Sequence, residues 1–315
     1  MNAITSVLGI QYPIIQGGMG NISNAVLTAA VSEAGGLGTI GAGTMSAEEV
    51  EQIIIETKGR TTRPFSVNVA LSVSPDAVEI LRLAVKHQVQ VVTLSAGNPA
   101  PFIPKLKEAG IKVITVVASV KQAKKAEAAG ADILVAEGYE AAGINSSLET
   151  TTLALIPQIV AQVGIPVVAA GGIGDGKGLA AMLALGASGV QMGTRFIATK
   201  EAPFHDVYKQ KLLQANDHET VIVGRSVGRI RRLLKTPYAG KLLEAEKQGI
   251  TREEFAELTT EDLHKKGALE GNEEYGFMNG GQVSGLITDI PTVKELLDRM
   301  VKEANERLKA AAALL

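Results

Sequence analysis

Glycine-rich segments at the ends of two apolar runs carry the clearest chemical signal in this sequence. "AAGGIGDGKG" contains Gly171 and Gly172, and "MGTRF" contains Gly193 and Thr194. Glycine has no Cβ, so its backbone N–H can approach an anion closely, and a following helix N-terminus adds its dipole. The two segments therefore predict a phosphate-binding cradle. The alternative is that the glycines only permit tight turns.

Few ordinary catalytic groups accompany this cradle. The chain has no cysteine, which excludes disulfides, thiolate metal sites, iron–sulfur clusters and cysteine nucleophiles. No pair of carboxylates has the spacing of a metal site, and we expect no metal. The four histidines fall in segments with a helical or cap pattern, and we expect them at the surface: His87, His205, His218 and His264. A phosphate cradle with so few acid–base groups indicates a cofactor that carries the chemistry.

The elements that position the cradle follow a repeated pattern over the first 200 residues. Each apolar run is followed by a small-residue exit and an amphipathic stretch. The runs span residues 13–19, 37–43, 64–71, 89–97, 112–119, 131–138, 166–173 and 189–196. Continuous apolarity is typical of parallel strands that are buried on both faces. We predict an α/β fold in which residues 1–199 form a (β/α)8 TIM barrel, with a doubly wound open sheet as the alternative.

The sequence changes character after Arg195. Residues 200–275 are charged, with a helical pattern and no strand-like run, and residues 276–287 are glycine-rich. We expect residues 200–291 to form a helical cap or lid, and residues 292–315 to form a helix that packs back on the barrel. The alternative is a helical decoration that only covers sheet edges.

The composition of the chain argues against nucleic acid or a membrane as a partner. The 315 residues are 46% hydrophobic, and 31 basic and 33 acidic residues give a net charge of −2. No basic block or aromatic–basic pattern favours nucleic acid. No apolar stretch approaches the roughly 18 residues of a membrane span. The first residues lack the pattern of a signal peptide. We expect a cytoplasmic protein, with a homodimer as one oligomeric state to consider.

Several segments together resemble a known family: "YPIIQGGM", "SEAGGLGTIGAG", "RPFSVNVAL", "SAGNP", "VAEGYEAAG", "PVVAAGGIGDGKG", "ALGASGVQMGTRF" and "FMNGGQVSGLI". They resemble the nitronate monooxygenase (2-nitropropane dioxygenase) family, which includes the flavin-dependent enoyl-acyl-carrier-protein reductase II. The resemblance covers nearly the whole chain in order. The cap segment "GRSVGRIRRLLKTPYAGKLLEAEKQG" is more similar to the enoyl reductase branch.

The resemblance implies an FMN-binding barrel. The residues it implies at the flavin are Gly18, Met19, Asn68, Glu137, Gly171, Gly172, Gln191, Met192, Gly193 and Thr194. It places the phosphate between Gly171–Gly172 and Gly193–Thr194, in agreement with the glycine argument. A loop would close near the flavin ring through Phe277, Met278, Gly281, Gln282 and Ser284.

One position departs from the family. After the sixth strand the family has a catalytic histidine, and Ile144 occupies that position here. Loss of a positioned general acid typically costs about 10²–10⁴-fold in rate. Tyr139, Ser146 and a water held by Asn145 are the candidates to replace it. The simpler interpretation of Ile144 is an apolar residue that lines the pocket.

Several functions fit these observations. The leading hypothesis is NAD(P)H-dependent reduction of an enoyl thioester, with acyl-carrier protein as a candidate partner. Oxidation of an anionic nitronate with oxygen is the second, because it needs no base at position 144. Others are dehydrogenation or isomerisation of an acyl chain, a flavin-binding protein without catalysis, and a barrel that binds a phosphorylated metabolite without flavin. The lack of cysteine argues against a mechanism like that of inosine-monophosphate dehydrogenase.

Overall fold

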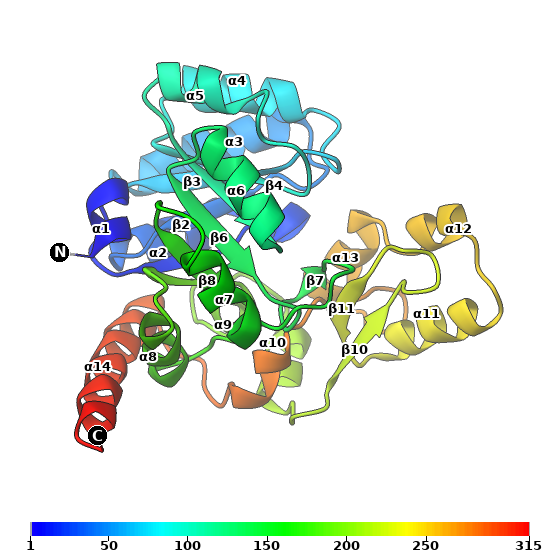
Figure 1. Ribbon diagram of the computed structural model, residues 1–315. Helices are drawn as coiled ribbons and strands as arrows, with labels where there is room; N and C mark the ends of the chain where they lie inside the picture. The colour runs from blue at the N-terminus through cyan, green and yellow to red at the C-terminus, as the bar shows by residue number, and fades with distance from the viewer. Residues whose placement is uncertain (1, 315) are drawn as a thin grey trace.

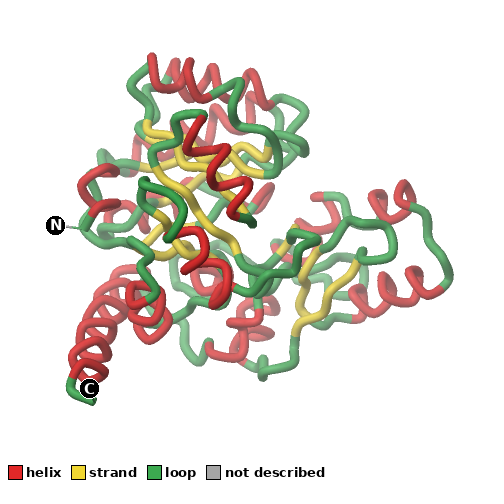
Figure 2. Tube along the Cα trace, in the orientation of Figure 1, coloured by secondary structure: helices red, strands yellow, loops and turns green. Residues whose placement is uncertain are grey.

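Eight parallel strands form the centre of the fold (Figures 1 and 2), described for residues 2–314 by a computed structural model. They are β1 (Ile14–Gln16), β2 (Gly38–Gly41), β3 (Phe65–Ala70), β4 (Val91–Ser95), β5 (Lys112–Val117), β6 (Ile133–Glu137), β8 (Val167–Ala170) and β9 (Gly189–Met192). Their order is β1-β9-β8-β6-β5-β4-β3-β2, and a bridge between Ile15 and Leu37 joins β1 to β2. The predicted (β/α)8 barrel is confirmed, and the open-sheet alternative is wrong.

The strands are mostly apolar because each one separates two cores. One set of side chains fills the barrel interior, for example Val91, Ile114 and Val168. The other set packs outward against the helices. Helix α1 (Ala3–Leu8) inserts Ile4 and Leu8 into the interior core and closes the N-terminal end of the barrel. The opposite, C-terminal end is therefore left for a site.

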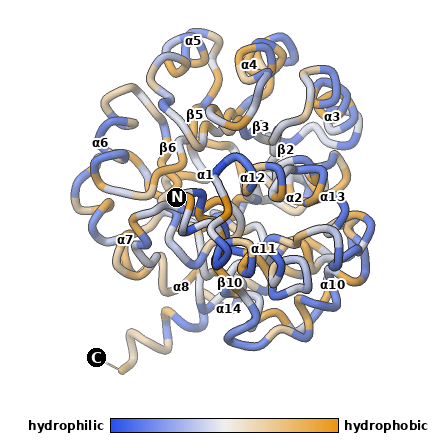
Figure 3. The backbone as a smooth tube through the Cα atoms, turned by 90° about the vertical axis from the view of Figure 1, so that its right-hand side faces the viewer, coloured by the Kyte–Doolittle hydropathy of each residue, from blue (hydrophilic) through white to orange (hydrophobic). Residues whose placement is uncertain are grey.

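Helices that follow the strands surround the barrel, and Figure 3 shows much of this ring from the side that the cap occupies. They are α2 (Ala25–Glu33), α3 (Ala47–Arg60), α4 (Ala77–Lys86), α5 (Ile103–Glu108), α6 (Val120–Ala128), α7 (Thr152–Val160), α8 (Gly176–Ala184) and α9 (Thr194–Ile197). Side chains of Asn24, Ser46, Ser119 and Asp175 accept backbone N–H bonds at the N-termini of α2, α3, α6 and α8. These caps fix where four of the helices begin.

The cap contains strands as well as helices, so the expectation of no strand in residues 200–275 is wrong. Strands β10 (Thr220–Val223) and β11 (Arg231–Leu234) pair antiparallel, and β7 (Gly143–Ile144), from the loop after β6, pairs with β11. All four residues in "TVIV" are β-branched, which favours a strand once a partner is present. Its partner "RRLL" lacks an alternating or continuous apolar pattern, so the sequence does not indicate this hairpin.

Helices complete the cap and close the chain. The cap helices are α10 (Asp206–Leu213), α11 (Pro237–Lys247), α12 (Arg252–Glu257) and α13 (Glu261–Ala268), with short 3-10 turns η1 (Gly20–Ile22) at the barrel and η2 (Gln282–Leu286) after the glycine-rich loop. Helix α14 (Val293–Ala312) packs on α8, where the backbone of Met300 lies so close to Gly176 that a Cβ there would approach its carbonyl oxygen to 2.4 Å. Among the residues described, no helix is both long and apolar enough to cross a membrane.

Candidate active site

A cavity of about 1150 Å³ lies at the C-terminal mouth of the barrel, beneath the cap. Residues from the exits of all eight barrel strands line it, and the cap adds Tyr208, Arg231, Glu261, His264, Asn279, Gly281 and Val283. Enzymes with this fold place their active sites at this end of the strands, because the loops there can vary without disturbing the barrel. The cavity is therefore the candidate active site.

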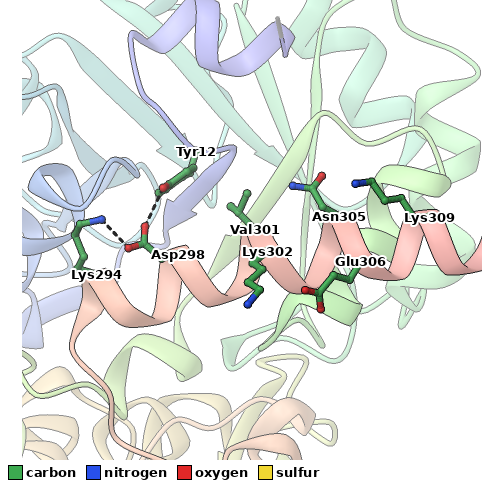
Figure 4. Close-up of a pocket in the computed structure, with 8 residues that line it drawn as sticks. All are labelled: Tyr12, Lys294, Asp298, Val301, Lys302, Asn305, Glu306 and Lys309. Carbon is green, nitrogen blue, oxygen red and sulfur yellow. Dashed lines mark hydrogen bonds and ion pairs between the residues drawn. The ribbon is translucent and has the colours of Figure 1, made fainter.

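A second hollow of about 580 Å³ runs along the exposed side of α14 (Figure 4). Its central carboxylate, Asp298, accepts a hydrogen bond of 2.8 Å from the Tyr12 hydroxyl and one of 2.7 Å from Lys294 Nζ. Both oxygens of this carboxylate are thus engaged by neighbours in the fold. Since the hollow is otherwise lined by solvated lysines and polar residues of one helix, we do not assign chemistry to it.

The residues implied at the flavin converge on the barrel-mouth cavity. All ten line it: Gly18, Met19, Asn68, Glu137, Gly171, Gly172, Gln191, Met192, Gly193 and Thr194. Gly18 must lack a side chain here, because a Cβ would lie 2.8 Å from the Cβ of Asn68. Asn68 in turn is held by a 3.1 Å hydrogen bond from its Nδ2 to Ser95 Oγ. The exits of β1, β3 and β4 thereby form one continuous wall.

The two halves of the predicted phosphate cradle differ in how well they could bind an anion. Gly171 and Gly172 have φ of +99° and +74°, a conformation that side chains disfavour. The helix that follows them, α8, is already capped by Asp175, whose side chain accepts from Gly178 N. Helix α9 has no side-chain cap, and a Cβ on Gly193 would meet nothing within 4 Å. Free backbone donors and open space therefore meet at Gly193, which is the half of the cradle best suited to an anion.

Glu137 is a half-buried acid of the cavity. It ends β6 and lines the barrel mouth. Burial raises the pKa of its carboxyl to about 7, because the charged form loses hydration. Near neutral pH this group can therefore donate or accept a hydrogen bond toward a ligand.

The loop expected to close over the flavin presents different residues from those predicted. Of the predicted set only Gly281 lines the cavity. Phe277 and Met278 are fully buried within the protein, and the Ser284 hydroxyl donates to the Gly281 carbonyl at 2.7 Å. Gln282 is exposed. Asn279 and Val283 face the cavity in their place. The reason is that Phe277 packs into the cap core with Val223 and Leu233, and Met278 packs into the main core.

The turn after β6 is tied down on both sides. Glu140 accepts hydrogen bonds from Thr152 N (2.9 Å) and Thr152 Oγ1 (2.9 Å). Asn145 N donates to Ile230 O at 3.0 Å, which joins the turn to the cap. Between these anchors Ile144 is 51% exposed and lines the cavity. The position of the family histidine is thus inside the candidate site, but its side chain is apolar.

The three candidates to replace that histidine have other roles or placements. Tyr139 does not line the cavity; its ring lies beneath the guanidinium groups of Arg225 and Arg232, and burial raises the pKa of its hydroxyl. Asn145 and Ser146 do line the cavity, but Asn145 Nδ2 donates to the Ala141 carbonyl at 2.8 Å and Ser146 Oγ accepts from Leu148 N. Their polar atoms mainly hold the turn together. Tyr139 does not suit the role of proton donor, because it lies outside the cavity.

One histidine lies in the cavity wall although the sequence pattern does not indicate this position. His264 on α13 is 2% exposed and lines the cavity, so its expected place at the surface is wrong. Its Nδ1 lies 3.4 Å from Glu261 Oε2, and its Nε2 lies 3.1 Å from Asn279 Nδ2. The only local signal was the spacing of Glu261 and His264, three residues apart on one helix face. By contrast, His218 is exposed as expected.

Comparisons with known proteins agree with this geometry. A family model described as nitronate monooxygenase matches residues 1–81 and 72–303. The (3aS,4S,5R,7aS)-5-hydroxy-7a-methyl-1-oxo-octahydro-1H-indene-4-carboxyl-CoA dehydrogenase of Mycobacterium tuberculosis is 35% identical, over 99% of this chain and 98% of that protein. FabK from Thermotoga maritima superposes with a TM-score of 0.94 at 41% identity, over 100% of this chain and 99% of that one. Nitroalkane oxidase from Streptomyces ansochromogenes gives a TM-score of 0.86 at 29% identity, over 98% and 99%.

Proposed function

Because the chain belongs to the nitronate monooxygenase family of FMN-dependent oxidoreductases, we propose that it reduces an enoyl thioester, with NAD(P)H as the source of hydride. The observation that carries the proposal is the cavity, which joins the glycine exits of β8 and β9 to a broad wall of small and apolar side chains. The likeness of the chain to a carboxyl-CoA dehydrogenase supports a thioester substrate. The likeness of the chain to FabK, together with the cap segment, supports the reductive direction of the reaction.

The residues at the barrel mouth fit FMN. Two buried oxygens of cavity residues, Thr115 Oγ1 and Asn279 Oδ1, have no hydrogen-bond partner among the residues described. Buried polar atoms in native proteins usually have a partner, so a ligand with polar edges suits this cavity. Gly193 and Thr194 would hold the phosphate, and Met19, Asn68 and Gln191 would hold the ring. When bound, FMN supplies reversible two-electron chemistry.

The volume of the cavity supports a substrate beside the cofactor. Pockets for one drug-sized molecule span roughly 300–1,000 Å³, and this cavity measures about 1150 Å³. Ala96, Ala118, Ala142 and Ile144 give it apolar surface suited to an acyl chain. Lys125 also lines it, and its positive charge suits the phosphate of a coenzyme A or an acyl-carrier protein. We propose one of these two carriers for the acyl group.

Oxidation of alkyl nitronates with oxygen is the second candidate. The observation that favours it is Ile144 itself, which cannot remove a proton but leaves room for a substrate that is already anionic. The likeness to a nitroalkane oxidase is consistent with it. Under this alternative the protein would need no nicotinamide.

The two candidates are separated by one assay on the purified, FMN-loaded protein. Anaerobic consumption of NADH or NADPH is followed with crotonyl-CoA, and oxygen uptake is followed with propyl-2-nitronate. The proposed function predicts nicotinamide oxidation that depends on crotonyl-CoA. Oxygen uptake with the nitronate, and no response to crotonyl-CoA, would favour the second candidate instead.

A further inference from the structure

The cap places the imidazole of His264 near the turn after β6, in which Ile144 occupies the position of the family histidine. In the register of β7 and β11, Ile144 lies opposite Arg231, and Arg231 Nη2 lies 3.7 Å from Glu261 Oε1. Glu261 orients His264 through the contact at Nδ1, and His264 contacts Asn279. The amide of Asn279 in turn lies 3.7 Å from where a Cβ on Gly143 would sit. A single amide therefore separates His264 from the residue next to Ile144.

Packing fixes the orientation of this imidazole. Its ring stacks on Phe277 with a centroid distance of 5.2 Å and an interplanar angle of 4°. Arg231 covers the Phe277 ring at 4.9 Å. Glu261 is itself anchored at the exit of β1, where its Oε2 lies 3.0 Å from the position of a Cβ on Gly20. A general acid must hold one geometry to be effective, and these contacts provide it.

Both ring nitrogens of His264 face a polar partner. Burial raises the pKa of Glu261, while the hydrogen bond and charge of His264 and the charge of Arg231 lower it more, to about 2. The ionised carboxylate is therefore an acceptor for an N–H at Nδ1 of His264. Asn279 Nδ2 faces Nε2 of the neutral ring, and Asn279 Oδ1 is buried without a partner. A 180° rotation of the Asn279 side-chain amide would exchange Nδ2 for Oδ1, and a protonated Nε2 could then donate a hydrogen bond to Oδ1.

We propose that His264, oriented by Glu261, is the proton donor of this site and takes over the role of the histidine missing at position 144. The inference rests on the proposed reduction of an enoyl thioester. In that reaction a hydride, whose source is the reduced nicotinamide, forms the new C–H bond at Cβ. Asn279 gives up its contact with Nε2 in this step, and the π electrons of the double bond then take the proton from Nε2 and form the C–H bond at Cα. Neutral His264 then regains a proton from solvent.

The test compares His264→Gln with His218→Gln in the FMN-loaded protein. Glutamine keeps a polar side chain but cannot transfer a proton, and His218 is an exposed histidine of the same cap. Three quantities are measured: kcat for crotonyl-CoA reduction, Kd for crotonyl-CoA by calorimetry, and the configuration of deuterium at Cα after reaction in D2O. We expect His264→Gln to lower kcat by about 10²–10⁴-fold. Its Kd should stay within about threefold, because the acid acts mainly in the transition state.

The deuterium readout separates a proton donor from a structural residue. The wild type and His218→Gln should place deuterium on one face of Cα, whereas the residual reaction of His264→Gln should deuterate both faces. Glu261→Gln provides a second variant that keeps the imidazole; it should lower kcat by about tenfold or more. Retention of kcat within about threefold in His264→Gln, or residual product with the wild-type configuration, would overturn the inference. A wild type that reduces no enoyl thioester would instead overturn the proposed function, and this inference with it.

Discussion

Arg231 lies directly opposite Ile144 in the antiparallel pair that joins the cap to the turn after β6. Backbone hydrogen bonds, rather than the side chain at 144, hold this turn in place, and the next residue continues the contact through Asn145 N and Ile230 O. The side chain at position 144 is therefore free to change without loss of the turn. It remains half exposed to the cavity in which the chemistry is proposed.

The variant Ile144→His should raise turnover. The side chain has room, and an imidazole there would add an acid–base group beside His264. We expect enoyl reduction or oxidation of neutral nitroalkanes to rise by on the order of tenfold. Leu148→His, in the same loop but outside the cavity lining, is the matched control. No gain in either reaction would mean that position 144 does not face the reacting atoms.

Gly193→Ala should weaken FMN binding without weakening the fold. A Cβ at this position meets no protein atom within 4 Å, and φ of −112° suits alanine. The methyl would instead occupy the space assigned to the phosphate, so the Kd for FMN should rise by about tenfold or more. Fluorescence titration and thermal melting measure the two effects. Gly59→Ala, at an exposed position of α3, should leave Kd unchanged. Unaltered FMN affinity in Gly193→Ala would place the phosphate elsewhere.

Glu137 should make stability depend on pH in a defined direction. Its folded pKa of about 7 lies above its ordinary value of 4.5, so the folded protein binds this proton more tightly than the unfolded chain. As pH rises from about 4.5 to 7, the free energy of unfolding should fall, and the contribution of Glu137 to this fall should be about 1–3 kcal/mol. Glu137→Gln should remove that part of the slope in urea unfolding, while Glu306→Gln, at an exposed position of α14, should keep it. Equal slopes in wild type and Glu137→Gln would contradict the burial argument.

Loss of the Glu261 charge should destabilise the cap through Arg231. Burial lowers the pKa of Arg231, and Glu261 is the carboxylate that opposes this effect. Glu261→Gln would leave a buried cation unpaired, which typically costs about 3–5 kcal/mol. Replacement of Arg231 by methionine in the same chain should recover part of that loss in urea unfolding. The folded pKa of Glu261, about 2, is below its ordinary value of 4.5, so its contribution should be full above about pH 4.5 and lost toward pH 2.

The barrel half of the site could be predicted from the sequence because parallel strands bring their exits to one end. Gly18, Asn68 and Gly193 are distant in the chain, yet each lies at or near the C-terminal end of a strand, so fold class alone places them together. The cap half could not be predicted in this way. His264 is buried against Phe277 and contacts Asn279, and no local pattern encodes either contact. The short strand at Arg231 forms only because β7 and β10 supply partners.

The reoxidation of the reduced protein by an enoyl thioester tests the central claim most directly. The FMN-loaded protein is reduced with one equivalent of NADH or NADPH without oxygen, and crotonyl-CoA is added while flavin absorbance is recorded. Our account predicts that absorbance returns and that butyryl-CoA forms in equal amount. A protein that takes up no FMN, or a reduced flavin that crotonyl-CoA leaves reduced, would contradict it.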